Sequence, residues 1–74
     1  MDQEKIGKFI AGARNQAGFT QKELAEQIGV SDKTVSKWEC GKSMPDISYL
    51  ETLCHSLNIS MNELVCGGGP DERA

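Results

Sequence analysis

Hydrophobic positions recur at helical spacing near the start of the chain. Between residues 3 and 17 they fall at offsets of 3, 4, 7 and 11, which places them on one face of an α-helix. They are Ile6, Phe9, Ile10, Ala13 and Ala17. Gly18 follows directly and suits the left-handed residue that ends a helix. The pattern predicts a first helix over residues 3–17, in which Gly7 and Gly12 each cost about 1 kcal/mol relative to Ala.

Residues 20–41 predict two short helices joined by a tight turn. Thr20 and Glu23 have the spacing of a capping box, in which each side chain bonds the other residue's backbone N–H. Gly29 ends this helix after about two turns. Ser31 is a favourable N-cap for the next helix, and Gly41 stands just past that helix's end.

Two further helices are predicted after a loop at residues 42–45. Pro45 disfavours helix at the residue before it, and Asp46 is expected to cap the helix that follows. The apolar stripe of that helix is Ile47, Leu50, Leu53, Cys54 and Leu57. Asn58 suits a left-handed ending, and Ser60 with Glu63 forms a second capping box that opens a short fifth helix.

Glycines at 67–69 followed by a proline end the regular pattern. The sequence therefore predicts one all-α domain over residues 1–66 and a flexible tail over residues 67–74. At 74 residues the chain is long enough for only one small core.

Three cysteines, Cys40, Cys54 and Cys66, are an odd number without C-x-x-C spacing. This pattern argues against a disulfide framework and a zinc site, and favours a reducing, cytoplasmic compartment. No signal peptide and no apolar run long enough to span a membrane is present in the sequence. His55 is expected to point outward, and no catalytic grouping or phosphate-binding glycine loop is evident. We therefore expect no enzyme activity, no metal, no cofactor and no small-molecule substrate.

The charge of the chain is unevenly distributed. The formal net charge is −3, which for the whole chain disfavours nucleic-acid binding. Residues 44–74 carry five acidic and one basic side chain, whereas residues 20–43 carry four of each. The excess negative charge therefore lies in the C-terminal third, and the two central helices are near neutral.

The two central helices meet the demands of a helix-turn-helix. Two helices that cross steeply need a small side chain at their closest approach, and Ala25 occupies that position. The turn needs a residue that accepts a positive φ, which Gly29 provides. The second helix needs apolar anchors behind it, and Val30, Val35 and Trp38 are suitably spaced.

With these residues in place, the chain resembles the lambda-repressor-like (Xre/Cro) helix-turn-helix family over roughly residues 3–66. The matching positions are Arg14, Gly18, Thr20, Gln21, Leu24, Ala25, Ile28, Gly29, Val30, Ser31, Val35, Ser36, Trp38, Glu39, Gly41, Lys42, Pro45, Leu50, Leu53, Leu57, Ile59, Ser60 and Leu64. The resemblance implies a compact bundle of five helices that binds double-stranded DNA. It also implies a transcriptional regulator, a repressor in particular, acting as a homodimer on a palindromic operator.

The resemblance places the N-terminal half of the third helix in the major groove. The side chains expected to contact bases are Asp32, Lys33, Ser36 and Lys37. Lysine can donate to guanine, and serine can bond several base edges. Asp32 has two possible roles: it can accept from cytosine, or fix Gln21 by a hydrogen bond. The alternative for this whole surface is a solvated helix face without function.

Contacts to the DNA backbone are expected from residues on either side of that helix: Thr20, Gln21, Lys42 and Ser43. Gln21 lies in the first turn of a helix, where free N–H groups favour phosphate. The capping role of Thr20 and the helix dipole near Lys42 are sufficient alternative explanations for those two residues. Cys40 departs from the family pattern, in which Arg or Asn often stands there, so one phosphate contact is expected to be missing.

Two charged residues are interpreted as structural. The resemblance implies a largely buried ion pair between Arg14 and Glu39; the alternative is that Arg14 contacts DNA.

Dimer contacts are expected from Met61, Leu64 and Val65, which also serve the core. A second functional hypothesis is a protein-interaction module, such as an antitoxin or adaptor, whose acidic C-terminal third docks a basic partner.

Overall fold

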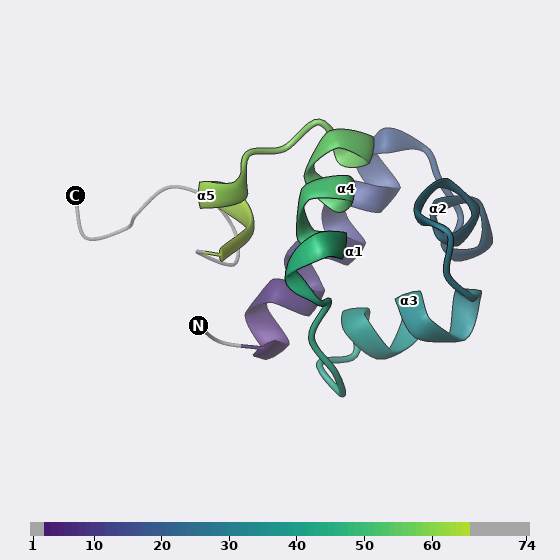
Figure 1. Ribbon diagram of the computed structural model, residues 1–74, viewed down its shortest axis with the longest axis horizontal. Helices are drawn as coiled ribbons and strands as arrows, with labels where there is room; N and C mark the ends of the chain where they lie inside the picture. Colours follow the sequence, from purple (N-terminus) through teal and green to yellow (C-terminus); the bar gives the residue numbers. More distant parts are fainter. Residues whose placement is uncertain (1–2, 66–74) are drawn as a thin grey trace.

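The computed structural model describes residues 3–65, which form five α-helices (Figure 1). The helices are α1 (Gln3–Ala17), α2 (Gln21–Ile28), α3 (Asp32–Glu39), α4 (Ile47–Leu57) and α5 (Met61–Val65). The all-α, five-helix fold predicted from the sequence is confirmed. The predicted tail at residues 67–74 lies outside the described residues.

The predicted helix ends are set by local hydrogen bonds. The Thr20 hydroxyl accepts from the backbone N–H of Glu23 at 3.0 Å, and the Glu23 carboxylate accepts from the backbone N–H of Thr20 at 2.9 Å. Ser60 and Glu63 repeat this arrangement at the start of α5. Asn58 adopts a φ of 57° at the end of α4. Both capping boxes and the left-handed ending are thus confirmed.

The core takes side chains from every helix. Its buried members are Ile6, Ile10, Leu24, Ala25, Val35, Trp38, Leu50, Leu53, Leu57 and Leu64. α3 packs against both α1 and α2, whereas α4 packs against α1, α2 and α5. Figure 1 shows α2 and α3 together at one end of the bundle and α5 at the other. The helix-turn-helix therefore forms one end of the molecule, with its back filled by the other helices.

One prediction at the start of α4 is wrong, and a second is right in position but not in its hydrogen bond. Helical spacing predicts Ile47 in the core, but it is the first residue of α4 and is 75% exposed, and the core residues of this helix begin at Leu50. Asp46 occupies the N-cap position, but its side chain makes no bond to the helix backbone. Its carboxylate instead accepts from the Ser48 hydroxyl at 3.1 Å.

Gly7 has a packing role that hydrophobic spacing does not reveal. The residue is buried within α1. A Cβ atom there would clash with the backbone carbonyl oxygens of Trp38 and Glu39. By contrast, a Cβ atom on Gly12 would meet nothing within 4 Å. Glycine at position 7 therefore lets α1 approach the end of α3. Gly12 has no such packing role and only lowers the stability of the helix relative to Ala.

Candidate nucleic-acid interface

α3 has two chemically different faces. Val35 and Trp38 are buried on the inner face, and the Trp38 ring lies 5.7 Å from the ring of Tyr49, centroid to centroid. Ser31 caps the helix start, because its hydroxyl accepts from the backbone N–H of Thr34 at 3.2 Å. The helix is thus fixed at its start and along its inner side before any ligand is bound.

The outer face of α3 carries the side chains that the sequence assigned to base contacts. Asp32, Lys33 and Lys37 are exposed, and Ser36 is half-buried. Lys33 and Lys37 are four residues apart, which is about one helical turn, so both side chains leave the same side of the helix. The structure therefore brings the four predicted residues together on one surface.

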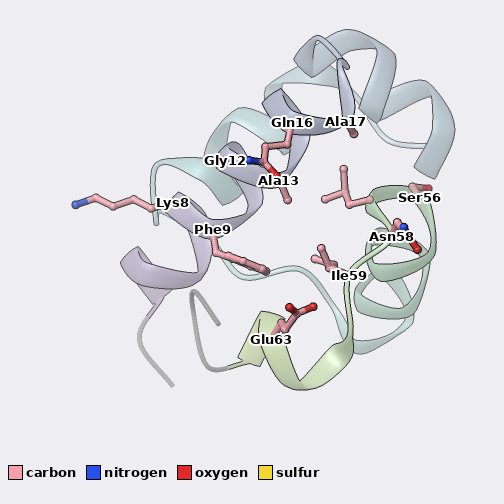
Figure 2. Close-up of a pocket in the computed structure, with 11 residues that line it drawn as sticks. Lys8, Phe9, Gly12, Ala13, Gln16, Ala17, Ser56, Asn58, Ile59 and Glu63 are labelled. Carbon is pink, nitrogen blue, oxygen red and sulfur yellow. The ribbon is translucent and has the colours of Figure 1, made fainter. Parts of the chain in front are cut away.

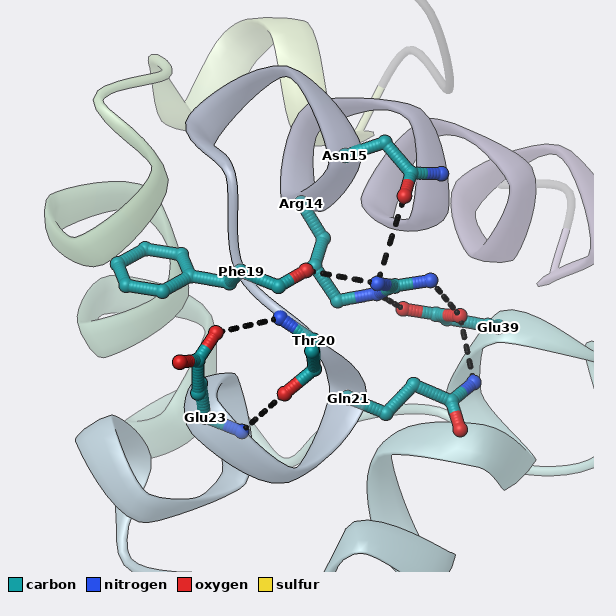
Figure 3. A network of polar contacts seen from close by, with 7 residues as sticks. All are labelled: Arg14, Asn15, Phe19, Thr20, Gln21, Glu23 and Glu39. Carbon is teal, nitrogen blue, oxygen red and sulfur yellow. Dashed lines mark hydrogen bonds and ion pairs between the residues drawn. The ribbon is translucent and has the colours of Figure 1, made fainter.

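A polar network joins α1, α2 and α3 behind this surface (Figure 3). Arg14 Nε donates to Glu39 Oε2 at 2.6 Å, and Arg14 Nη2 donates to Glu39 Oε1 at 3.2 Å. Arg14 Nη1 also donates to the backbone carbonyl oxygen of Phe19 at 2.8 Å. The Arg14 and Glu39 side chains are only 13% and 7% exposed. The structure thus contains the predicted ion pair, and the pair ties the end of α3 to α1 and to the loop before α2.

Gln21 belongs to the same network, which sequence reasoning missed. Its amide nitrogen, Nε2, donates to Glu39 Oε1 at 2.8 Å. Of the two roles considered for Asp32, fixing Gln21 is therefore not the one seen in this structure. The signal in the sequence is weak, because Gln21 and Glu39 are 18 positions apart and on different helices.

The other predicted backbone contacts lie at either side of the network. Thr20 is exposed, and its hydroxyl oxygen already accepts one bond from the capping box. After α3, the backbone N–H groups of Lys42 and Ser43 both donate to the carbonyl oxygen of Lys37. The lysine is exposed and the serine is half-buried. Both segments are thus held by backbone hydrogen bonds.

The loop after α3 is also tied to the start of α1. The side-chain amide of Gln3 donates to the backbone carbonyl oxygen of Gly41 at 2.7 Å. Gly41 has a φ of 77°, which suits glycine. Cys40, beside it, is an exposed free thiol at the C-cap of α3. Because a thiol is a weak donor, the position supplies no strong phosphate contact.

A separate groove lies between α1 and the end of α4, with a volume of about 690 Å³. Figure 2 shows Phe9, Ala13 and Ile59 facing the groove, while Lys8 extends away from it. Phe9, Ala13 and Ile59 also pack against the hydrophobic core. None of the four predicted base-contacting residues lines this groove.

Met61 and Leu64, two of the three residues expected at a dimer contact, differ in accessibility, and the side chain of Val65 lies outside the described part of the structure. Leu64 is fully buried in the core, so the expectation that it contacts a partner is wrong for this arrangement of α5. Met61 is 36% exposed.

Within residues 3–65, no helix has the length and hydropathy needed to cross a membrane, and no three metal-ligating side chains converge.

Comparison with known proteins agrees with this geometry. A sequence model of the family described as "Helix-turn-helix" matches residues 10–64, which is most of the chain and includes α2 and α3. The chain belongs to the lambda-repressor-like (Xre/Cro) helix-turn-helix family. The family predicted from the sequence is thereby confirmed.

Relatives in this helix-turn-helix family include regulators of both signs. The chain is 37% identical over 54 residues to the transcriptional activator BcrR of Enterococcus faecalis, covering 73% of this chain and 26% of BcrR. It is 35% identical over 63 residues to the cryptic phage CTXphi transcriptional repressor RstR of Vibrio cholerae, covering 85% of this chain and 55% of RstR. The chain thus spans between about a quarter and about half of these relatives.

A solved structure extends the likeness to three dimensions. The biofilm-formation regulator SinR, solved in complex with DNA, superposes with a TM-score of 0.75 at 33% identity. The superposition covers 81% of this chain and 97% of the SinR chain. This chain and SinR therefore share one fold over nearly the whole of the SinR chain.

Proposed function

We propose that this chain is the DNA-binding domain of a transcriptional regulator and that α3 reads base edges in the major groove of double-stranded DNA. The observation that carries the proposal is the division of α3 into a buried apolar face and an exposed polar face. A helix fixed from behind can enter the major groove without rearranging. The regulator and repressor names of family members, and the DNA-bound SinR structure, support the same function.

Base contacts are assigned to the exposed face of α3. Lys33 and Lys37 can donate to O6 and N7 of guanine, and Ser36 can bond several base edges. Asp32 is assigned to N4 of cytosine. In the structure the Gln21 amide, its other predicted partner, is bonded to Glu39. Together these residues predict a preference for G·C pairs in each half-site.

Backbone contacts are assigned to the two segments that flank the reading face. Gln21 and Thr20 contact phosphate at the start of α2, where the positive end of the helix dipole favours an anion. Lys42 and Ser43 contact phosphate after α3. The number of cations is small, so we expect modest affinity and a shallow dependence on salt concentration.

The regulator is proposed to act in the cytoplasm as a homodimer on a palindromic operator. A two-fold dimer presents two copies of α3 to successive major grooves, about 34 Å apart. Met61, an exposed apolar side chain on α5, is available for the dimer contact, whereas Leu64 is not. Repression follows when the bound dimer excludes other proteins from the operator.

The proposal is tested by gel retardation of DNA selected by the wild-type chain. Lys33→Ala with Lys37→Ala should abolish sequence preference, and Lys8→Ala, an exposed lysine beside the α1–α4 groove, should leave it unchanged. If the wild-type chain retards no DNA at low salt, the proposal is wrong. A protein-interaction module, such as an antitoxin or adaptor, then becomes the better interpretation.

A further inference from the structure

A buried carboxylate holds the amide group of Gln21 from behind (Figure 3). Glu39 accepts from Gln21 Nε2 at 2.8 Å and from Arg14 Nε at 2.6 Å. The Glu39 side chain is 7% exposed. It cannot turn toward solvent without leaving the Arg14 guanidinium unpaired, which is costly in a largely buried site. The position of Glu39, and with it the acceptor for Gln21, is therefore fixed by the ion pair.

We infer that Glu39 is a positioning residue for DNA binding and that it acts through Gln21. The inference rests on the proposed function, because Gln21 is there assigned to a phosphate. An amide nitrogen carries two hydrogens. Glu39 takes one, which leaves the second available to a phosphate oxygen. A glutamine held in this way loses less side-chain freedom on binding than an unrestrained one, so the contact is preorganised.

The hydrogen bond between Gln21 and Glu39 also fixes the position of the proposed phosphate contact relative to the proposed base contacts. Gln21 is the first residue of α2, and Glu39 is the last residue of α3. Their hydrogen bond therefore fixes the phosphate-binding start of one helix against the end of the helix that reads bases. Without it, the two contacts could still form, but the chain would have to order Gln21 at the moment of binding.

Removal of the whole ion pair makes the inference testable. The test variant combines Arg14→Met with Glu39→Leu, which removes one positive and one negative charge together and leaves the net charge unchanged. A change in DNA binding then does not come from a change in the net charge near phosphate. A positioning role predicts weaker binding. Replacing both members of a buried ion pair by apolar residues commonly preserves folding, and circular dichroism checks this before any binding measurement.

The full chain and this variant are compared on DNA selected by the wild-type protein. We expect binding about three- to tenfold weaker, as for the loss of one well-placed hydrogen bond. The slope of log affinity against log salt should stay the same, because no phosphate-contacting cation is lost. Wild-type affinity in this variant would overturn the inference.

A double-mutant cycle with Gln21→Ala separates positioning from a general structural effect. If Glu39 acts through Gln21, the triple variant should bind as Gln21→Ala alone does. Additive losses would overturn the inference, since they would mean that Arg14 contacts DNA directly or that the apolar pair disturbs α3. Lack of DNA binding by the wild-type chain would overturn the proposed function and this inference together, whereas additivity overturns the inference only.

A second measurement needs no variant. NMR relaxation of side-chain amide groups in the free wild-type chain should show the Gln21 amide to be as ordered as the backbone of α2. The exposed Gln27, on the same helix, is the control and should be mobile. Equal mobility of the two amides would contradict the preorganised contact.

Discussion

The two faces of α3 differ in burial and in their contacts within the chain. On the inner side, Val35 and Trp38 lie in the core, and Glu39 is bonded to both Arg14 and Gln21. On the outer side, Lys33 and Lys37 project into solvent. The inner face is held by contacts within the chain, whereas the outer face is exposed and is assigned to a DNA partner.

This difference separates the residues that hold the fold from those assigned to base contacts along a helix of eight residues. Glu39 is assigned to both stability and the positioning of Gln21. Substitutions on the inner face should change the free energy of unfolding, because they leave cavities or unpaired buried groups. Substitutions on the outer face should change DNA binding while leaving the fold intact.

Glu39→Ala should produce the largest loss of stability. It leaves the Arg14 guanidinium, 13% exposed, without its carboxylate partner. We expect the free energy of unfolding to fall by about 3–5 kcal/mol. Thermal or urea denaturation followed by circular dichroism measures the loss. Glu26→Ala, an exposed carboxylate on α2, is the control. An unchanged melting temperature for Glu39→Ala would rule out a structural role for the ion pair.

Two glycines of α1 should respond in opposite directions to the same substitution. Gly7→Ala drives a methyl group against backbone carbonyl oxygens of α3, so it should destabilise the domain by about 1–3 kcal/mol. Gly12→Ala meets no atom within 4 Å and should stabilise it by up to about 1 kcal/mol. Urea denaturation of both variants gives the comparison. Equal responses would mean that α1 does not approach α3 as closely as the structure shows.

The outer face should tolerate the loss of both lysines. Lys33→Ala with Lys37→Ala should change the free energy of unfolding by no more than about 0.5 kcal/mol, because both side chains are exposed. The same variant should lose sequence preference on DNA. Denaturation and gel retardation on one preparation measure both quantities. A large loss of stability would contradict the prediction that the outer face of α3 does not contribute to folding.

The smallest effect concerns two thiols. Burial raises the pKa of the Cys54 thiol above its usual 9.0, and the carboxylates of Glu51 and Glu63 raise it further. Because the thiolate is the reactive form, Cys54 should be alkylated by iodoacetamide more slowly than the exposed Cys40. A Cys66→Ser background leaves only these two thiols. Faster reaction at Cys54 would contradict its burial.

The raised pKa also predicts the sign of a pH dependence. The folded chain holds the Cys54 proton more tightly than the unfolded chain does. Its contribution to stability is therefore fully present below the unfolded pKa, near 9.0, and is lost as pH rises through the folded pKa. Cys54→Ala should reduce the fall in unfolding free energy on the alkaline side.

The sequence predicted most of the fold because local signals and the global arrangement agree. The boxes of Thr20 with Glu23 and of Ser60 with Glu63 place two helix starts, and Asn58 places one helix end. Errors occurred where a position is helical but peripheral. Spacing alone put Ile47 on the core stripe, yet the stripe begins to pack only at Leu50.

The candidate site was predictable in position but not in its connections. Helical spacing and the family resemblance placed Lys33 and Lys37 on the outer face, but neither reveals a hydrogen bond between Gln21 and Glu39. That bond, like the contact of Gly7 with the end of α3, depends on how three helices meet in space. The base sequence of the proposed operator belongs to the DNA, so neither helical spacing nor the packing of the chain gives it.

Binding-site selection with the wild-type chain tests the central claim most directly. Random double-stranded DNA is incubated with the protein at low salt, and retained molecules are sequenced over several rounds. We expect enrichment of two inverted half-sites whose centres lie about one helical turn, or 34 Å, apart. Folded protein that enriches no sequence over random DNA would contradict the claim that α3 reads a specific operator.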